Sequence, residues 1–416
     1  MKTKVYRRRW IVIFAFTVLH AILQHVWCVF SSVMTDAWHW YGFADASSGE
    51  TAISMLTMAY MVGMVVLYVP SVWVFDRFGW YKSVVFSGVW LTVWLLLRGV
   101  LAGHSYAMLL LCTCGCAAAQ PFMINAFGMI AAKWFPPEER GIANGIGMIS
   151  TFLGVVMAQF GVPFMITNLG MDIPGVLKVF GLISIPALFF FIFAAKEAPP
   201  LPPADEMLVE RADFAGSFKL LFHNKQFISG VVVFCLLQGV YFTFTTYIEA
   251  ILQFFNDNSV DVMFVGTLGT IITIAGSIAT IVLPVISDRT RSKKRLPLVR
   301  LCEIGSILGL ALVIFGHSYS LMIVMACMLG VFLIGVTPVL LVYSFEAAYP
   351  VSEGVTEGIM QGGANGFGAI CILCINGVFH GNHLGTMLAF IAAAVVSLLL
   401  SLFAREASLQ DRKLKK

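Results

Sequence analysis

Residues 76–82 read Asp-Arg-Phe-Gly-Trp-Tyr-Lys, a short charged stretch that follows a long apolar run. The Asp-Arg pair returns at residues 288–289, about half the chain length later, and again follows a long apolar run. A second pair of similar stretches, Trp-Phe-Pro-Pro-Glu at 134–138 and Tyr-Pro-Val-Ser-Glu at 349–353, is separated by nearly the same interval. Two features that recur at one spacing indicate that the chain consists of two similar halves.

The composition is dominated by the apolar runs between these stretches. Of the 416 residues, 59% are hydrophobic and 12% are charged, whereas a soluble globular chain has about 25% charged residues. This balance excludes a soluble enzyme, and it excludes a disordered chain, which needs low hydrophobicity and high charge. No basic soluble domain is available for a nucleic-acid partner. The composition therefore predicts a helical protein embedded in a lipid bilayer.

A helix needs roughly 20 apolar residues to cross a bilayer. This criterion predicts twelve membrane-spanning helices at 10–33, 51–75, 83–102, 105–132, 141–165, 173–195, 226–254, 261–286, 298–316, 320–345, 354–379 and 384–403. The first span follows Arg7, Arg8 and Arg9, but it is too long for a signal peptide and lacks a small-residue cleavage site. We therefore expect it to remain as a helix in the mature protein.

The basic residues predict the orientation of these helices. Of the 26 Lys and Arg residues, all except Arg98 and Lys178 lie at the termini or in every second loop. Because loops rich in Lys and Arg stay on the cytoplasmic side, both termini are predicted to be cytoplasmic. We expect a multi-pass protein of the plasma membrane, or of the inner membrane if the source is bacterial.

The longest hydrophilic stretch, 196–224, divides the predicted helices into two sets of six. It begins Lys-Glu-Ala-Pro-Pro-Leu-Pro-Pro, which is typical of a stiff linker. The predicted domains are an N-terminal half at 1–195, a cytoplasmic linker at 196–224, a C-terminal half at 225–404 and a basic tail at 405–416. Two parallel six-helix repeats resemble the architecture of major facilitator transporters, so we predict an all-α membrane protein of that fold.

The loop at 76–82 resembles the signature loop of the same superfamily, Gly-x-x-x-Asp-Arg-x-Gly-x-x-Lys/Arg, although Val72 replaces the leading glycine. The resemblance implies a cytoplasmic gate in which each loop carboxylate meets the positive end of a helix N-terminus. Asp76 would then meet the helix that starts near Gly354, and Asp288 the helix that starts near Gly141. The alternative is that both loops are solvated and only set the topology. The candidate gating residues are Asp76, Arg77, Asp288, Arg289 and Glu357.

A closer resemblance, to the FLVCR-type family (relatives of the feline leukaemia virus subgroup C receptor), covers almost the whole chain. It is carried by Arg8-Arg9-Trp10, Gln24-His25-Val26-Trp27, Tyr68-Val69-Pro70-Ser71, Ala119-Gln120-Pro121, Ala132-Lys133-Trp134-Phe135, Gly239-Val240-Tyr241, Ser287-Asp288-Arg289-Thr290 and residues 346–354. The resemblance implies transport of choline and ethanolamine, or heme export. It also implies an amine site at Trp27, Gln120, Tyr241 and Asn365, the last of which departs from the glutamine of the family.

The polar residues inside the predicted helices support a site independently of this resemblance. They form stripes at helical spacing, namely His20, Gln24 and Trp27, then Gln238, Tyr241 and Thr245, and finally Glu357, Gln361 and Asn365. Polar side chains are costly in lipid, so we expect these stripes to face a cavity. The alternative is that they only form hydrogen bonds between helices. The candidate substrate-binding residues are Trp27, Gln120, Tyr241, Asn365, Gln24, Gln361, Gln238 and Asn125.

An aromatic pair such as Trp27 and Tyr241 suits a quaternary ammonium, whose diffuse charge is attracted to ring faces. The alternative is that both rings only pack. Glu249 and Glu303 are predicted close to helix ends, where water reaches them, which favours uniport over proton coupling. A potential of 100 mV is worth about 2.3 kcal/mol per charge, enough to accumulate a cation. Glu357 is the main objection, because it starts a polar stripe and could titrate.

The sequence leaves other functions open. An organic anion carrier would use Arg98, and heme would need His or Cys ligands, for which no dedicated set is found. A non-transporting receptor would need neither matched gates nor polar stripes. No Ser-Lys, His-Glu-x-x-His or paired-Asp arrangement indicates an enzyme, and the nine cysteines show no zinc-like spacing. We therefore expect a monomeric transporter without metal or cofactor, which works by alternating access around a small molecule held between its halves.

Overall fold

The computed structural model describes residues 4–103, 105–124, 126–136, 139–203, 221–289, 294–349, 351 and 353–406. These residues form helices and connecting turns, and no strand occurs among them. Twelve helical segments are long and apolar enough to cross a membrane, which confirms the predicted all-α fold. Residues 204–220 of the predicted linker and 407–416 of the predicted tail lie outside the described residues.

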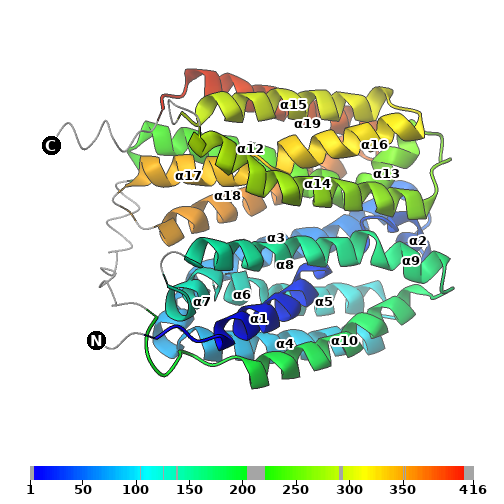
Figure 1. The fold of residues 1–416 in the computed structure, drawn as a ribbon. Coiled ribbons are helices and arrows are strands. Elements are labelled where there is room, and N and C mark those ends of the chain that lie inside the picture. Colours follow the sequence, from blue (N-terminus) through cyan, green and yellow to red (C-terminus); the bar gives the residue numbers. More distant parts are fainter. Residues whose placement is uncertain are drawn as a thin grey trace. The chain divides into compact units, whose positions relative to one another are not determined.

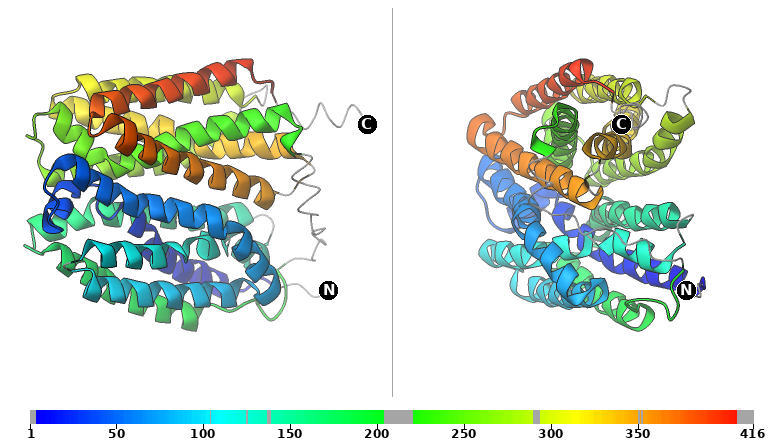
Figure 2. Two further views of the ribbon diagram at one scale, coloured as in Figure 1. Left: turned by 180° about the vertical axis from the view of Figure 1, so that it is seen from behind. Right: turned by 90° about the vertical axis from the view of Figure 1, so that its left-hand side faces the viewer.

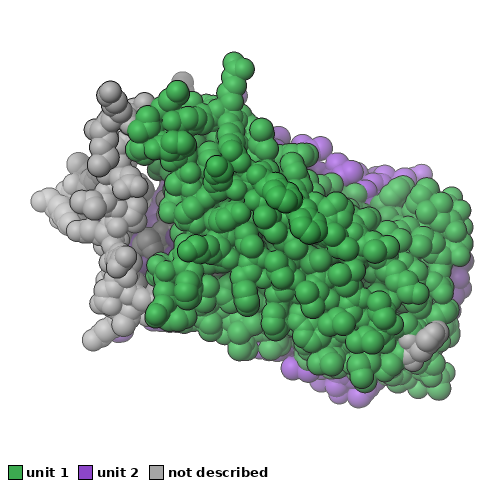
Figure 3. Space-filling view, turned by 90° about the horizontal axis from the view of Figure 1, so that it is seen from below, with its two compact units in different colours: residues 1–209 green, residues 210–416 purple. Residues whose placement is uncertain are grey.

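The chain forms two compact units, residues 1–209 and 210–416, coloured separately in Figure 3. Within each unit the helices run roughly alongside one another (Figures 1 and 2). Unit 1 contains α1 (Arg8–Gln24), η1 (Val26–Cys28), α2 (Met34–Trp40), α3 (Ala46–Phe78), α4 (Trp80–Leu101), α5 (Tyr106–Ala117), α6 (Gln120–Ile124), α7 (Ala126–Trp134), α8 (Arg140–Gln159), α9 (Gly161–Thr167) and α10 (Ile173–Ala194). Unit 2 contains α12 (Lys225–Thr246), α13 (Ile248–Phe255), α14 (Val262–Arg289), α15 (Leu296–Phe315), α16 (Tyr319–Met328), η3 (Leu329–Ile334), α17 (Thr337–Ala348), α18 (Glu353–Cys374), η4 (Ile375–Phe379) and α19 (His383–Phe403).

Several helices begin at a side chain that accepts backbone N–H groups of the first turn. Asp45 accepts from the N–H of Ser48 before α3, and Asn224 accepts from the N–H groups of Gln226 and Phe227 before α12. The hydrogen bonds from Ser48 lower the pKa of Asp45 below its ordinary value. Such caps satisfy N–H groups that have no partner within the helix, so they fix where each span starts.

Small residues allow helices to approach closely within unit 1. A Cβ atom added to Gly99 of α4 would lie 2.9 Å from the Cα atom of Lys178, and one added to Gly181 of α10 would lie 3.0 Å from the carbonyl oxygen of Leu95. Because lipid gives helices no hydrophobic reason to associate, such close backbone contact is a main source of their packing energy. The helices α4 and α10 are therefore closely packed.

In unit 2 a carboxylate connects α15 and α19. Glu303 is 0% exposed, and its two carboxylate oxygens accept hydrogen bonds from the hydroxyls of Ser397 (2.6 Å) and Ser401 (2.5 Å). Glu249 is also buried, with 1% of its surface exposed. The prediction that water reaches these two acids near helix ends was therefore wrong. Helix packing covers both side chains, which a position near the end of a span does not reveal.

Replacing Glu303 by alanine should lower the free energy of unfolding by about 2 kcal/mol, because the buried hydroxyl of Ser397 loses its acceptor and that of Ser401 keeps only the carbonyl of Leu398. Glu303→Gln should retain much of the stability, since its amide can accept from one serine and donate to the other. Ser306→Ala is a matched control on α15, because that hydroxyl donates only to the carbonyl of Cys302 in its own helix. Thermal unfolding of the purified variants measures the difference, and an equal loss in Glu303→Ala and Ser306→Ala would contradict this role.

Candidate substrate-binding site

The first membrane span changes its helix type next to a predicted site residue. The α-helix α1 ends at Gln24, and the chain tightens into the 3-10 turn η1, which carries Trp27. The indole of Trp27 is 8% exposed. The span is therefore not one continuous α-helix as far as Trp27, and the shared face of His20, Gln24 and Trp27 stays a prediction.

Side chains of the neighbouring helix α3 hold this break. The hydroxyl of Tyr60 donates to the carbonyl of Leu23 (3.2 Å), and the hydroxyl of Thr57 donates to the carbonyl of Trp27 (2.8 Å). Backbone groups that lose their helical partner inside a membrane need such substitutes. Thr57 and Tyr60 therefore position Trp27. No sequence signal marks these two residues, because isolated Thr and Tyr residues are common in apolar helices.

The fourth span is interrupted in the same way. The helix α5 ends at Ala117 and α6 begins at Gln120, the second predicted site residue of this half. The hydroxyl of Ser87 in α4 donates to the carbonyl of Ala119 (2.9 Å), which lies inside the break. Gln120 is buried, and its side-chain oxygen has no hydrogen-bond partner within the described part of the chain. Asn125, the other candidate of this span, lies outside the described residues.

Gln24 belongs to a hydrogen-bonded network inside unit 1. Its amide nitrogen lies 3.0 Å from Nε2 of His20, whose Nδ1 lies 2.7 Å from the hydroxyl of Ser150. That hydroxyl donates its proton to the carbonyl of Gly147, so Nδ1 of His20 must donate and Nε2 must accept from Gln24. All three side chains are buried. The network fixes the position of Gln24 and uses both ring nitrogens of His20.

In unit 2 the predicted residues lie on two helices that pack against each other, α12 and α18. Tyr241 and Gln238 are on α12, and both are buried, Tyr241 with 6% of its surface exposed. The side-chain oxygen of Gln238 has no hydrogen-bond partner among the described residues. On α18, the amide nitrogen of Asn365 donates to the carbonyl of Gln361 (2.9 Å). The structure thus places four candidates on one pair of helices.

The gating candidates lie at the helix ends, and Asp288 takes part in an ion cluster that the sequence did not reveal. Arg295 donates to Asp288 (2.8 Å) and to Glu346 (3.0 Å). Burial alone lowers the pKa of Arg295, but the hydrogen bonds and opposite charges of the two carboxylates outweigh it, so the pKa lies above its ordinary value. Asp76 and Glu357 are exposed, and the expected contacts with the helix starts near Gly354 and Gly141 stay predictions.

The guanidinium of Arg77, the gating candidate beside Asp76, lies 5.4 Å from the ring of Trp73. Arg289, its counterpart, is the last residue of α14 and is exposed. Arg98 differs from both, because it is buried in the last turn of α4 with 1% of its surface exposed. None of its three guanidinium nitrogens has a hydrogen-bond partner in the described part of the chain, and the guanidinium carbon lies 5.5 Å from the ring centroid of Phe30.

Comparison with known proteins agrees with this architecture. The family model of the Major Facilitator Superfamily matches residues 10–370. The chain is 26% identical to the human choline/ethanolamine transporter FLVCR2 over 387 residues, which cover 88% of this chain and 71% of that protein. It is 24% identical to the choline/ethanolamine transporter FLVCR1 of the cat, with 89% of this chain and 68% of that protein covered. These similarities confirm the resemblance to the FLVCR-type family.

Solved structures show the same fold at lower identity. A bacterial homolog of the human lysosomal transporter Spinster, in an inward-facing and unoccupied conformation, has a TM-score of 0.73 at 15% identity and covers 96% of this chain and 98% of its own. A D-xylose-proton symporter has a TM-score of 0.72 at 13% identity, with 96% and 98% covered. With twelve membrane-competent helices and a family match over most of its length, the chain is a membrane transporter of the Major Facilitator Superfamily.

Proposed function

We propose that this protein moves a small amine, such as choline or ethanolamine, across the membrane by alternating access without a coupled ion. Trp27 and Tyr241 would attract the ammonium group, and Gln120 and Asn365 would hold its polar end. Gln24, Gln361 and Gln238 would complete the polar lining. The gate would use Asp76, Arg77, Asp288 and Arg289, together with Glu357.

The observation that carries this proposal is the position of the unit 1 residues at two breaks of membrane helices. Trp27 lies on the 3-10 turn after α1, and Gln120 begins α6 after the break in the fourth span. Helices that are interrupted within the bilayer are typical of substrate sites in transporters, because irregular backbone is tolerated only where it faces protein or a cavity. A buried indole and a buried amide are the chemistry that a quaternary ammonium with a hydroxyl requires.

The absence of a coupled ion is supported by the surroundings of the buried acid Glu303. Both carboxylate oxygens accept hydrogen bonds from serine hydroxyls of α19, as described above. A carboxylate with both oxygens bonded in this way connects α15 to α19, so we assign it a role in the packing of unit 2. The membrane potential alone supplies about 2.3 kcal/mol per charge at 100 mV, or roughly fiftyfold accumulation of a monovalent cation.

Uptake of labelled choline and ethanolamine into proteoliposomes tests this proposal. Saturable uptake that increases with an inside-negative potential and is unchanged by a pH gradient is the expected result. Uptake that requires a proton gradient would contradict uniport and support a proton-coupled mechanism. No uptake of either amine at any potential, by protein whose thermal unfolding shows that it is folded, would contradict the amine assignment.

The second candidate is an organic anion carrier, and the buried Arg98 is the observation that favours it. An isolated buried charge is costly unless a partner of opposite charge compensates it, and an anionic substrate could be that partner. Its position in the last turn of α4, which the sequence predicts to be near the outer end of the third span, favours the amine over an anion held at the centre of the membrane. Uptake of organic anions that is lost in Arg98→Gln but retained in Lys178→Gln would favour this second function.

A further inference from the structure

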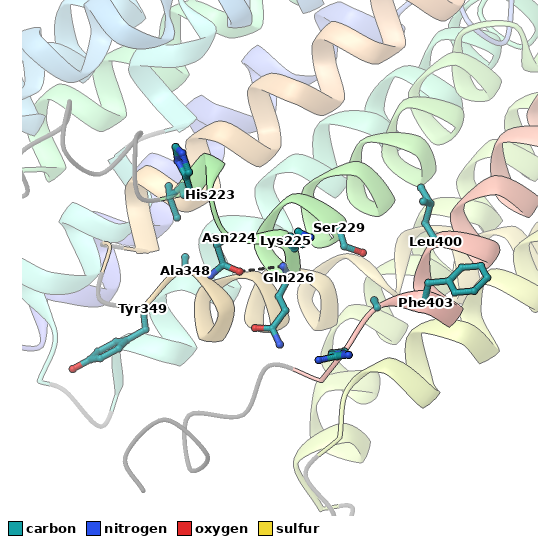
Figure 4. Close-up of a pocket in the computed structure, with 12 residues that line it drawn as sticks. His223, Asn224, Lys225, Gln226, Ser229, Ala348, Tyr349, Leu400 and Phe403 are labelled. Atoms are coloured by element: carbon teal, nitrogen blue, oxygen red, sulfur yellow. Dashed lines mark hydrogen bonds between the residues drawn. The ribbon is translucent and has the colours of Figure 1, made fainter. Parts of the chain in front are cut away.

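Unit 2 contains a cleft of about 870 Å³ at the end of its helix bundle where α12 begins and α17 and α19 end. Figure 4 shows Lys225 and Gln226 at the start of α12, Tyr349 after α17, and Phe403 at the end of α19 around this cleft. None of the predicted substrate or gating residues lines it. Its volume falls within the range of small-ligand sites, which hold a headgroup but not a whole lipid.

The cleft is positively charged. Lys225 and Arg405 line it and are exposed, and neither forms an ion pair with a described residue. The nearest acid in the sequence, Glu406, accepts hydrogen bonds from the backbone N–H groups of Arg295 and Leu296 at the start of α15. The carboxylate of Glu406 therefore binds the start of α15. The positive charges of Lys225 and Arg405 remain available to an anion.

The rim of the cleft is apolar and aromatic. The side chain of Phe403 is 86% exposed, and Leu400 and Tyr349 are exposed beside it. These residues end the membrane-spanning helices α19 and α17, so they lie at the depth of the lipid headgroups and upper acyl chains. Tyrosine and other aromatic residues are enriched at this depth. The distribution of Lys and Arg assigns this end of the helices to the cytoplasmic leaflet, which carries the anionic lipids.

We propose that this cleft binds an anionic phospholipid of the cytoplasmic leaflet. Lys225 and Arg405 hold the phosphate of the headgroup, and the acyl chains lie against Phe403 and Leu400. Basic pockets between membrane helices on the cytoplasmic side are suited to such headgroups. The inference concerns a site outside the substrate pathway and does not depend on the amine assignment.

The test compares two doubly substituted full-length proteins of equal net charge. Lys225→Gln with Arg405→Gln removes both charges from the cleft. Arg7→Gln with Lys82→Gln removes two exposed charges of unit 1 that are predicted to face the same side of the membrane and do not line the cleft. Native mass spectrometry, in detergent, measures the retention of phosphatidylglycerol and phosphatidylcholine, and thermal unfolding verifies that each protein is folded.

We expect the parent to retain phosphatidylglycerol in preference to phosphatidylcholine, and the cleft variant to lose about tenfold in affinity while the control changes less than about twofold. Phe403→Ala should weaken binding of the lipid without affecting binding of a water-soluble glycerophosphate.

Equal losses of affinity in the two double variants would show only general electrostatic attraction and would overturn the site. Displacement of the lipid by millimolar inorganic phosphate would identify a free-phosphate site instead. If the parent retains no phosphatidylglycerol, the proposed lipid site is overturned. Because the readout is binding, failure here leaves the transport proposal untouched, and failure of amine uptake leaves this one untouched.

Discussion

Choline uptake should fall by more than tenfold when either Trp27 or Tyr241 is replaced by alanine. A desolvated cation–π contact is worth about 2 kcal/mol, which corresponds to a roughly 30-fold rise in KM for each ring removed. Both side chains are buried, so thermal unfolding of each variant must accompany the uptake measurement in proteoliposomes.

Trp27→Phe and Tyr241→Phe serve as matched controls, because they retain an aromatic face while they reduce its size or remove its hydroxyl. Both should keep most of the uptake, and Trp27→Phe should lose more than Tyr241→Phe, since indole is the better cation partner. Folded alanine variants that transport choline as well as the parent would show that the two rings only pack, and the amine site would then lie elsewhere.

The second large effect is expected at Gly154, where α8 contacts α1. A Cβ atom at this position would lie 2.5 Å from the carbonyl oxygen of Ala21 and 2.6 Å from the Cβ atom of Gln24. Both neighbours belong to the rigid part of α1, so Gly154→Ala must push the two helices apart. We expect a loss of roughly 2 kcal/mol in the free energy of unfolding, together with reduced uptake, because the network of Gln24, His20 and Ser150 connects these helices.

Gly145→Ala is the control on the same helix, because a Cβ atom there meets nothing within 4 Å. Alanine is favoured over glycine inside a helix by about 1 kcal/mol, so this variant should be as stable as the parent or more stable. Thermal unfolding in detergent compares the two. A Gly154→Ala protein that unfolds at the same temperature as Gly145→Ala would show that α1 and α8 separate easily.

The sequence predicted the membrane helices well and the irregular features poorly. Hydropathy over 20 residues is a strong signal, and all twelve spans were found, with most ends displaced by five residues or fewer. The predicted span 226–254 is the exception, because the helix ends at Thr246 and a separate helix, α13, follows. The turn at Val26–Cys28 and the break before Gln120 have no such signal, since no proline or glycine marks the first and Pro121 follows the second. They depend on hydroxyls of α3 and α4 that reach freed carbonyls, which are contacts between distant parts of the chain.

The burial of the acids could not be predicted from the sequence for a related reason. Glu303 lies eight residues into α15, and nothing in its own helix shows that Ser397 and Ser401 of α19 cover it. Arg295 likewise joins Asp288 to Glu346 across three elements. Sequence patterns predict which face of a helix is polar, whereas the partner of a charged group is decided by tertiary packing.

The hydroxyl that donates to the carbonyl of Trp27 has a consequence for discrimination between the two proposed substrates. The ammonium of ethanolamine carries three N–H donors, whereas the ammonium of choline carries none. The hydroxyl of Thr57 can move to a second χ1 rotamer, and the carbonyl of Trp27 that it leaves is an acceptor for the ammonium of ethanolamine but not for the ammonium of choline. Selectivity between the amines would then reside in the main chain at the turn, while the indole attracts both of them alike.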